Sequence, residues 1–269
     1  MQINVRENSY HVSVYGAGQP YWLFLHGFMG SGQDFASIAQ HIKGTALLPD
    51  LLGHGQSGKP TQPKRYAMAR QAADLKNILQ QLQIDQPLRL VGYSMGGRLG
   101  LYFSWRYPQL VQQLILESST AGLATPEQRG KRQQQDQAKA HFLQTKPLAE
   151  FVAHWEQLPL FASQKTLPPE LKEQVRQQRL SQEPQALAAS LLGMGTGVMP
   201  NLWLYLAQIS LPVMLITGQQ DRKFQGIMRQ MAAQLPQAQL HVIAQAGHNV
   251  HLEQPQSYCR LLKEFLPCV

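Results

Sequence analysis

The chain has 269 residues, of which 43% are hydrophobic and 15% charged. This length suits one sizeable α/β domain with an insertion or two small domains, and the composition excludes a disordered chain. The formal net charge is +8. Because the lysines and arginines are scattered, without a basic run or interleaved aromatic residues, the sequence argues against a nucleic-acid partner and leaves an anionic substrate open.

The two cysteines, Cys259 and Cys268, lie near the C-terminus. A pair placed in this way is no disulfide framework, so a reducing compartment fits best. The N-terminal residues lack the basic start and apolar run of a signal peptide, and no apolar stretch reaches membrane-spanning length. We therefore expect a soluble, cytoplasmic protein without membrane insertion.

Six short apolar runs predict buried β-strands. Continuous rather than alternating apolar character is typical of strands covered on both faces in a parallel sheet. Helical periodicity, as in residues 68–82, separates the runs and indicates an α/β fold with a mostly parallel, doubly wound sheet. The predicted strands are residues 21–25, 45–48, 88–91, 114–116, 213–216 and 240–243.

The alternation of strands and helices stops between residues 121 and 204. This stretch is rich in glutamine, arginine and alanine, is punctuated by prolines and contains no strand-like run. We interpret it as a helical lid at the carboxyl edge of the sheet, inserted in a core formed by residues 1–120 and 205–269. Its glutamine tracts predict solvated helix faces rather than disorder, because apolar residues interrupt them.

The segment Gly92-Tyr93-Ser94-Met95-Gly96 follows a predicted strand and opens a predicted helix, 96–107. Its glycines permit a tight strand-to-helix turn that lifts the Ser94 hydroxyl above the sheet and leaves the Met95 N–H free. A helix N-terminus also favours negative charge at this point. A chance match to the five letters is common, so further features are needed.

Those features are a second amide donor, an acid and a base. Phe28 follows an upstream buried strand, where its N–H and that of Met95 are predicted to form an oxyanion hole. Asp221 and His248 each follow a later strand, which gives the chain order serine, aspartate, histidine of the α/β-hydrolase fold. The imidazole takes the hydroxyl proton of Ser94, and the carboxylate fixes its tautomer.

Glu117 also ends a strand and is the rival acid. Asp221 is favoured because it lies in the loop before the last predicted strand, 240–243, which His248 follows. His26 and His54 flank glycine turns and are predicted to be structural, and no spacing typical of a metal site occurs.

Arg98 lies one helical turn beyond Ser94 on the same side. A cation at the beginning of a helix interacts unfavourably with the helix dipole, at a cost of roughly 0.3–1 kcal/mol. One interpretation is a solvated or ion-paired arginine. The other is an anion clamp that holds a substrate carboxylate through bidentate hydrogen bonds.

The segment from Val91 to Leu99 resembles the corresponding turn of the 2-succinyl-6-hydroxy-2,4-cyclohexadiene-1-carboxylate synthase family of menaquinone and phylloquinone biosynthesis. The similarity extends over essentially the whole chain and includes residues 24–31, 117–123, 127–133, 221–224 and 246–253. Residues 218–220 read Gly-Gln-Gln where the family often has an acidic residue, which loosens the local match.

The resemblance implies a small polycarboxylate substrate that loses pyruvate, without a cofactor. Ser94 and His248 would act together as a base that removes a ring proton, rather than forming an acyl-enzyme. The residues that the resemblance implies in substrate binding are Arg98, Tyr93, Arg132, Trp155 and Arg179, with Arg176 as the rival of Arg179. The alternative interpretation of each lid arginine is a solvent-exposed helix residue that does not bind the substrate.

Two other functions remain open. A carboxylesterase or carbon–carbon hydrolase of the same fold would share the serine, but its pocket would be mainly apolar where Arg98 and the lid arginines lie. A ligand receptor built on a hydrolase scaffold would not need a complete triad and oxyanion hole.

Overall fold

The computed structural model describes residues 1–265, and Cys268 lies outside them. At its centre is an eight-stranded sheet with the order β1-β2-β4-β3-β5-β6-β7-β8. The strands are Gln2–Val5 (β1), Asn8–Tyr15 (β2), Tyr21–Leu25 (β3), Thr45–Pro49 (β4), Leu88–Tyr93 (β5), Val111–Glu117 (β6), Val213–Gly218 (β7) and Ala238–Ile243 (β8). The β1–β2 and β2–β4 pairs are antiparallel, and all other pairs are parallel.

The six strands expected from apolar runs correspond to β3 through β8. Strands β5 and β7 are buried at every position, as expected for the centre of a parallel sheet. Strands β1 and β2 were not predicted. In β2 buried and partly exposed residues alternate over most of its length, because only one face of this antiparallel strand packs on the core.

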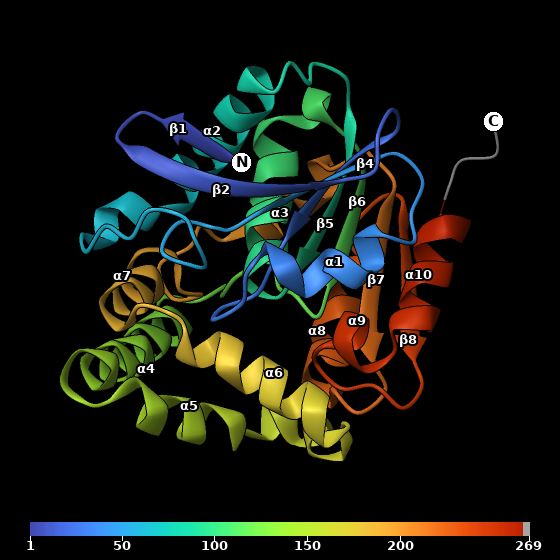
Figure 1. Ribbon diagram of the computed structural model, residues 1–269. Helices are drawn as coiled ribbons and strands as arrows, with labels where there is room; N and C mark the ends of the chain where they lie inside the picture. The colour runs from blue at the N-terminus through green and yellow to red at the C-terminus, as the bar shows by residue number, and fades with distance from the viewer. Residues whose placement is uncertain (266–269) are drawn as a thin grey trace.

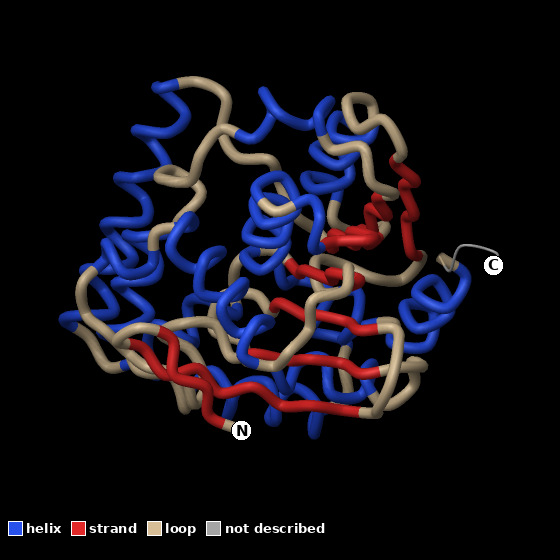
Figure 2. Tube along the Cα trace, turned by 90° about the horizontal axis from the view of Figure 1, so that it is seen from above, coloured by secondary structure: helices blue, strands red, loops and turns tan. Residues whose placement is uncertain are grey.

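Helices cover both faces of the sheet (Figures 1 and 2). Apolar residues of α2, α3 and α8 form the core on one face, and those of α1 and α10 on the other. The α-helices are Ala36–Ala39 (α1), Met68–Gln81 (α2), Met95–Arg106 (α3), Pro126–Thr145 (α4), Leu148–Glu156 (α5), Pro169–Leu180 (α6), Pro184–Met194 (α7), Arg222–Ala232 (α8), Val250–Glu253 (α9) and Pro255–Glu264 (α10). None of the helices in residues 1–265 is long and apolar enough to cross a membrane.

Helices α4 to α7 gather at one end of the molecule, between β6 and β7 in the sequence (Figure 1). Their apolar side chains form a separate small core that includes Met29 of the loop after β3. Thr125 caps α4 with a capping box, in which its side chain accepts from the Gln128 N–H. The lid helices therefore pack against the loop that also carries Phe28. The division into core and lid at residues 121 and 204 stays a prediction.

Candidate active site

Ser94 lies between the end of β5 and the beginning of α3, with φ at +50°. This backbone conformation is unfavourable for a residue with a side chain, and such strain is concentrated at functional sites. Gly96 is required by close packing, because a Cβ there would collide with the carbonyl oxygens of Leu25 and His26. The tight approach of α3 to β3 thus holds the serine at the carboxyl end of the sheet.

The structure brings Ser94, His248 and Asp221 into one hydrogen-bonded row. His248 Nε2 lies 3.1 Å from Ser94 Oγ, and His248 Nδ1 lies 2.7 Å from Asp221 Oδ2. The other oxygen of Asp221 accepts from the Phe224 N–H at 3.2 Å. With Nδ1 donating to the carboxylate, Nε2 is left as the acceptor for the serine proton.

Phe28 and Met95 both line the cavity in front of Ser94. Neither backbone N–H donates a hydrogen bond to another described residue. The loop that carries Phe28 is held by His26, whose Nε2 accepts from the Leu51 N–H at 2.9 Å and whose Nδ1 donates to the Gly27 carbonyl at 2.7 Å. His26 therefore has a structural part, as the sequence indicated, and both predicted oxyanion donors remain available.

Glu117, the rival acid, belongs to a different histidine. Its carboxylate accepts from His251 Nδ1 at 2.7 Å and from the backbone N–H groups of Val250 and His251 at 2.6 and 3.1 Å. Glu117 and His251 are both fully buried, and the His251 ring stacks on Phe35. This second pair fixes α9, immediately after His248. The Glu117 carbonyl accepts from the Ser94 N–H at 2.9 Å, but within residues 1–265 neither the Glu117 nor the His251 side chain forms a hydrogen bond to Ser94.

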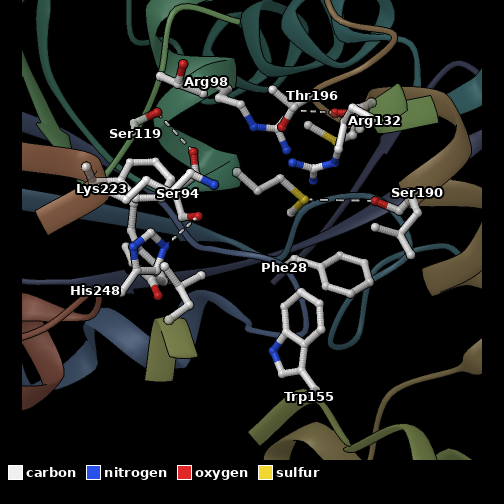
Figure 3. Close-up of a pocket in the computed structure, with 18 of the residues that line it drawn as sticks. Phe28, Ser94, Arg98, Ser119, Arg132, Trp155, Ser190, Thr196, Lys223 and His248 are labelled. Atoms are coloured by element: carbon white, nitrogen blue, oxygen red, sulfur yellow. Dashed lines mark hydrogen bonds between the residues drawn. The ribbon is translucent and has the colours of Figure 1, made fainter. Parts of the chain in front are cut away.

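The cavity in front of Ser94 has a volume of about 140 Å³. Its walls come from the loop after β3, the serine turn, the lid, the beginning of α8 and His248. In Figure 3 the side chains of Arg98 and Arg132 point toward one another over the cavity, with Phe28 and Trp155 across from them. Three cations line it: Arg98, Arg132 and Lys223.

Arg98 is 8% exposed and forms no ion pair with a carboxylate of residues 1–265. Its Nη1 donates to the Met194 carbonyl at 2.5 Å. Burial, reinforced by repulsion from Arg132 and opposed by Asp136, lowers the pKa of Arg98 to about 9. The guanidinium is thus charged at neutral pH, desolvated and without a counter-ion in residues 1–265, which favours the anion-clamp interpretation over the solvated one.

Arg132, from helix α4, reaches the same cavity. Its Nε donates to Asp136 Oδ1 at 2.8 Å, one helical turn along α4. The side chain is 32% exposed, so it is neither fully solvated nor buried. Asp136 therefore orients Arg132 at the cavity wall and neutralises part of its charge.

Two predicted aromatic residues also lie at the cavity. Tyr93 packs under the loop that carries Phe28, where a Cβ on Gly27 would come within 2.6 Å of its ring. Trp155, from α5, contacts Phe28 with ring centroids 5.3 Å apart. The lid and the predicted oxyanion loop thus meet through a contact of two aromatic rings.

The structure does not bring Arg179 to this cavity. Its Nη1 lies 3.1 Å from Glu156 Oε1 and its Nη2 donates to Gln164 Oε1 at 3.1 Å. Arg176, the rival, contacts the other oxygen of Glu156 at 2.6 Å. Both arginines are therefore occupied by one lid carboxylate in this structure.

Lys223 was not singled out as a site residue from the sequence. It lies two positions after Asp221, within the segment 221–224 that resembles the family. This segment is a signal that the region belongs to the site, but it does not show which of its cations faces the serine: Arg222 adjoins Asp221 and does not line the cavity. Four hydroxyl residues also line the cavity without having been predicted: Ser119, Thr120, Ser190 and Thr196.

Comparisons with known proteins show the family to which the chain belongs. A family described as alpha/beta hydrolase fold matches residues 23–255. The putative 2-succinyl-6-hydroxy-2,4-cyclohexadiene-1-carboxylate synthase of Bacillus subtilis (strain 168) is 41% identical over 91% of this chain and 89% of its own. The synthase of that name from Serratia proteamaculans (strain 568) is 32% identical over 93% of this chain and 94% of its own.

Among solved structures, MenH from S. aureus superposes with a TM-score of 0.91 and 34% identity, over 95% of this chain and 97% of its own. The similarity therefore includes the lid as well as the sheet. The chain belongs to the α/β-hydrolase fold family and, within it, to the 2-succinyl-6-hydroxy-2,4-cyclohexadiene-1-carboxylate synthases.

Proposed function

We propose that the protein is a 2-succinyl-6-hydroxy-2,4-cyclohexadiene-1-carboxylate synthase of menaquinone biosynthesis. It eliminates pyruvate from 2-succinyl-5-enolpyruvyl-6-hydroxy-3-cyclohexene-1-carboxylate. The observation that carries the proposal is Arg98, a buried cation that has no carboxylate partner in residues 1–265 and lies beside the hydrogen-bonded serine–histidine–aspartate row. An ester pocket does not need such a charge, whereas a substrate with several carboxylates does.

The first step is removal of a ring proton next to the succinyl ketone. His248 Nε2 accepts the hydroxyl proton of Ser94 across their 3.1 Å contact, as Ser94 Oγ takes the proton from carbon. Asp221 stabilises the imidazolium that results, through its 2.7 Å contact with Nδ1. The serine and the histidine thus act as one base, and no acyl-enzyme forms.

Removing that proton leaves negative charge on the oxygen of the succinyl ketone. In this proposal the N–H groups of Phe28 and Met95 stabilise it. This role is supported by their place in the lining of the cavity and by the absence of another partner for either group in residues 1–265. Collapse of the enolate breaks the bond between the ring carbon and the enolpyruvyl oxygen. The leaving enolpyruvate takes a proton and becomes pyruvate.

The three cations of the cavity bind the carboxylates of the substrate in different ways. Arg98 offers a planar fork of donors to one carboxylate, and Arg132 and Lys223 supply charge on the other walls of the cavity. A small polycarboxylate is therefore the proposed partner. Arg179 has no part in this proposal, because Glu156 and Gln164 occupy it.

The proposal is tested by measuring pyruvate released from the enolpyruvyl compound, coupled to oxidation of NADH by lactate dehydrogenase. We expect turnover by the wild type and a loss of about 10²- to 10⁴-fold in Ser94→Ala, because the base is lost. Ser104→Ala is the matched control. Ser104 is also buried in α3, but it does not line the cavity and should leave turnover unchanged.

The competing functions give different results. A carboxylesterase would hydrolyse p-nitrophenyl esters at ordinary rates and release no pyruvate from the enolpyruvyl compound. A ligand receptor would bind the compound equally well in the wild type and in Ser94→Ala, without turnover in either. Each of these results would overturn the proposal.

We place the reaction in the cytoplasm. The chain carries only two cysteines, and Cys259 forms no disulfide within residues 1–265. Free thiols are typical of a reducing compartment. Fractionation of the producing cells tests this placement, with recovery from the membrane or extracellular fraction as the contrary result.

A further inference from the structure

A second charged cleft lies at the opposite end of the sheet from Ser94. It has a volume of about 700 Å³ and is formed at the amino ends of β3, β5 and β6, with residues after α1 and in α10 at its sides. Its lining residues are Gln19, Pro20, Trp22, Gln40, His41, Ile42, Lys43, Arg89, Gln112, Leu262 and Lys263. We call it the Arg89 cleft.

All the charged side chains that line the Arg89 cleft in residues 1–265 are positive. Lys43, Arg89 and Lys263 are cations, His41 adds a group that is positive when protonated, and no aspartate or glutamate lines the cleft. The lysines are exposed, whereas Arg89 is 8% exposed. The cleft therefore offers one buried cation at its base and two mobile cations at its rim.

Arg89 is held in place by the sheet. It is the direct neighbour of Trp22 in the parallel pairing of β5 with β3, and its Cζ lies 4.9 Å from the centre of the Trp22 ring. Burial lowers the pKa of Arg89 below its usual value. The guanidinium forms no ion pair with residues 1–265, and its Nε–H is buried without a hydrogen-bond partner.

Packing on Trp22 gives the face of the Arg89 guanidinium a partner but leaves its N–H donors without one in residues 1–265. A cation–π contact uses the flat face of the group, whereas its N–H donors lie in the plane and point from the edge. An anion in that plane can accept from the terminal Nη–H groups of Arg89, which are not among its buried atoms, without disturbing the contact with Trp22. Because buried donors without partners are rare and costly, the free edge of Arg89 requires an explanation.

We propose that the Arg89 cleft binds a small molecule through a phosphate or carboxylate group, with the Arg89 edge as its central contact and Lys43 and Lys263 at its rim. This site is separate from the catalytic one. Arg89 lies at the beginning of the extended strand β5 and Ser94 directly after its end, five residues further on, which corresponds to about 16 Å. The proposal is independent of the reaction at Ser94.

Calorimetric titration of the whole protein with inorganic phosphate, and separately with citrate, tests the proposal at constant ionic strength. The phosphate arm and the carboxylate arm identify which group the cleft prefers. We expect saturable binding of at least one. Binding of neither probe at concentrations up to about 10 mM, which would reveal a dissociation constant near 1 mM, would overturn the proposal.

Variants assign the binding to the cleft rather than to the cavity in front of Ser94. Arg89→Met keeps an apolar side chain on Trp22 and removes the charge, and should weaken binding by about tenfold or more. Arg106→Met is the matched control, because Arg106 also lies over an aromatic ring, 5.6 Å from the centre of Tyr107, but does not line the cleft. It should bind as the wild type does.

Two further measurements keep the test decisive. If Arg89→Met is unstable, the double variant Lys43→Met/Lys263→Met, at two exposed positions, should weaken binding severalfold. Arg98→Met, which removes the clamp of the catalytic cavity, should leave binding at the cleft unchanged. Binding that disappears in Arg98→Met and persists in the cleft variants would contradict the proposal.

Discussion

Arg98 of helix α3 and Met194, the last residue of helix α7, are joined by a hydrogen bond of 2.5 Å from guanidinium to carbonyl oxygen. The bond connects the helix that follows Ser94 to the lid. One carbonyl occupies one of the five N–H donors of an arginine, so donors are left for a substrate carboxylate. Met194 therefore orients the cation without neutralising it.

Replacing Arg98 by methionine removes the charge and keeps most of the side-chain volume. We expect kcat/KM for pyruvate release to fall by about 10- to 100-fold, mainly through a higher KM, because a charge-assisted hydrogen bond to the substrate contributes about 1.5–3 kcal/mol. Arg98→Lys keeps the positive charge but loses the planar pair of N–H donors, so its kcat/KM should lie between those of the wild type and Arg98→Met. Unchanged kinetics in a folded Arg98→Met protein would exclude the anion clamp.

Asp221 and Glu117 each pair with a histidine, and the two pairs should respond differently to loss of charge. Asp221→Asn preserves the size of the side chain but no longer fixes the tautomer of His248. We expect turnover to fall by about three to four orders of magnitude, with thermal stability little changed. Pyruvate release and thermal unfolding are measured on the same preparation.

Glu117→Gln is the matched substitution in the second pair. It weakens the bonds to His251 and to two backbone N–H groups, in a fully buried place. We expect the free energy of unfolding to fall by about 1–3 kcal/mol, with turnover per folded molecule much less affected than in Asp221→Asn. If Glu117→Gln were the more damaging of the two to catalysis, Glu117 would be the catalytic acid.

Most of the fold and the core of the site could be predicted from the sequence because both depend on local patterns. Continuous apolar runs identified β3 through β8, and the glycine turn with its chain order identified Ser94, Asp221 and His248. Strand β2 was missed because only one of its faces packs on the core, so buried and partly exposed residues alternate and no continuous apolar run marks it. Strand β1, which pairs with it, has the same kind of alternating pattern.

The lid arginines show a different limit. Periodicity places Arg132 and Arg179 on helices, but which arginine reaches the cavity depends on where carboxylates from other helices lie. Asp136 holds Arg132 at the cavity wall, whereas Glu156, more than twenty residues away from Arg179, draws that side chain elsewhere. Such competition between distant side chains is decided by packing.

Lys223 lines the cavity and forms no ion pair with a carboxylate of residues 1–265. We expect Lys223→Met to raise KM by severalfold to about tenfold, with kcat changed less, because the lysine attracts the substrate and takes no part in proton transfer. Arg222→Met, the neighbouring cation that does not line the cavity, is the control. Equal effects of the two substitutions would indicate a general loss of charge.

His54 makes the stability of the protein depend on pH. Burial, reinforced by repulsion from His26, lowers the pKa of His54 from 6.5 to about 3. Below pH 6.5 the unfolded chain therefore binds a proton that the folded protein excludes, and the free energy of unfolding falls until the pH reaches about 3. The stability due to the neutral ring is fully present above pH 6.5.

Urea unfolding at pH 7 and pH 5 measures this contribution. We expect His54 to account for a decrease of about 2 kcal/mol between the two values. His54→Asn keeps a donor for the Leu52 carbonyl but does not titrate, so it should be less stable at pH 7 and lose less on acidification. His41→Asn, at an exposed histidine, should retain the wild-type dependence. If His54→Asn lost as much stability as the wild type between pH 7 and pH 5, the buried ring would not be the source of the acid sensitivity.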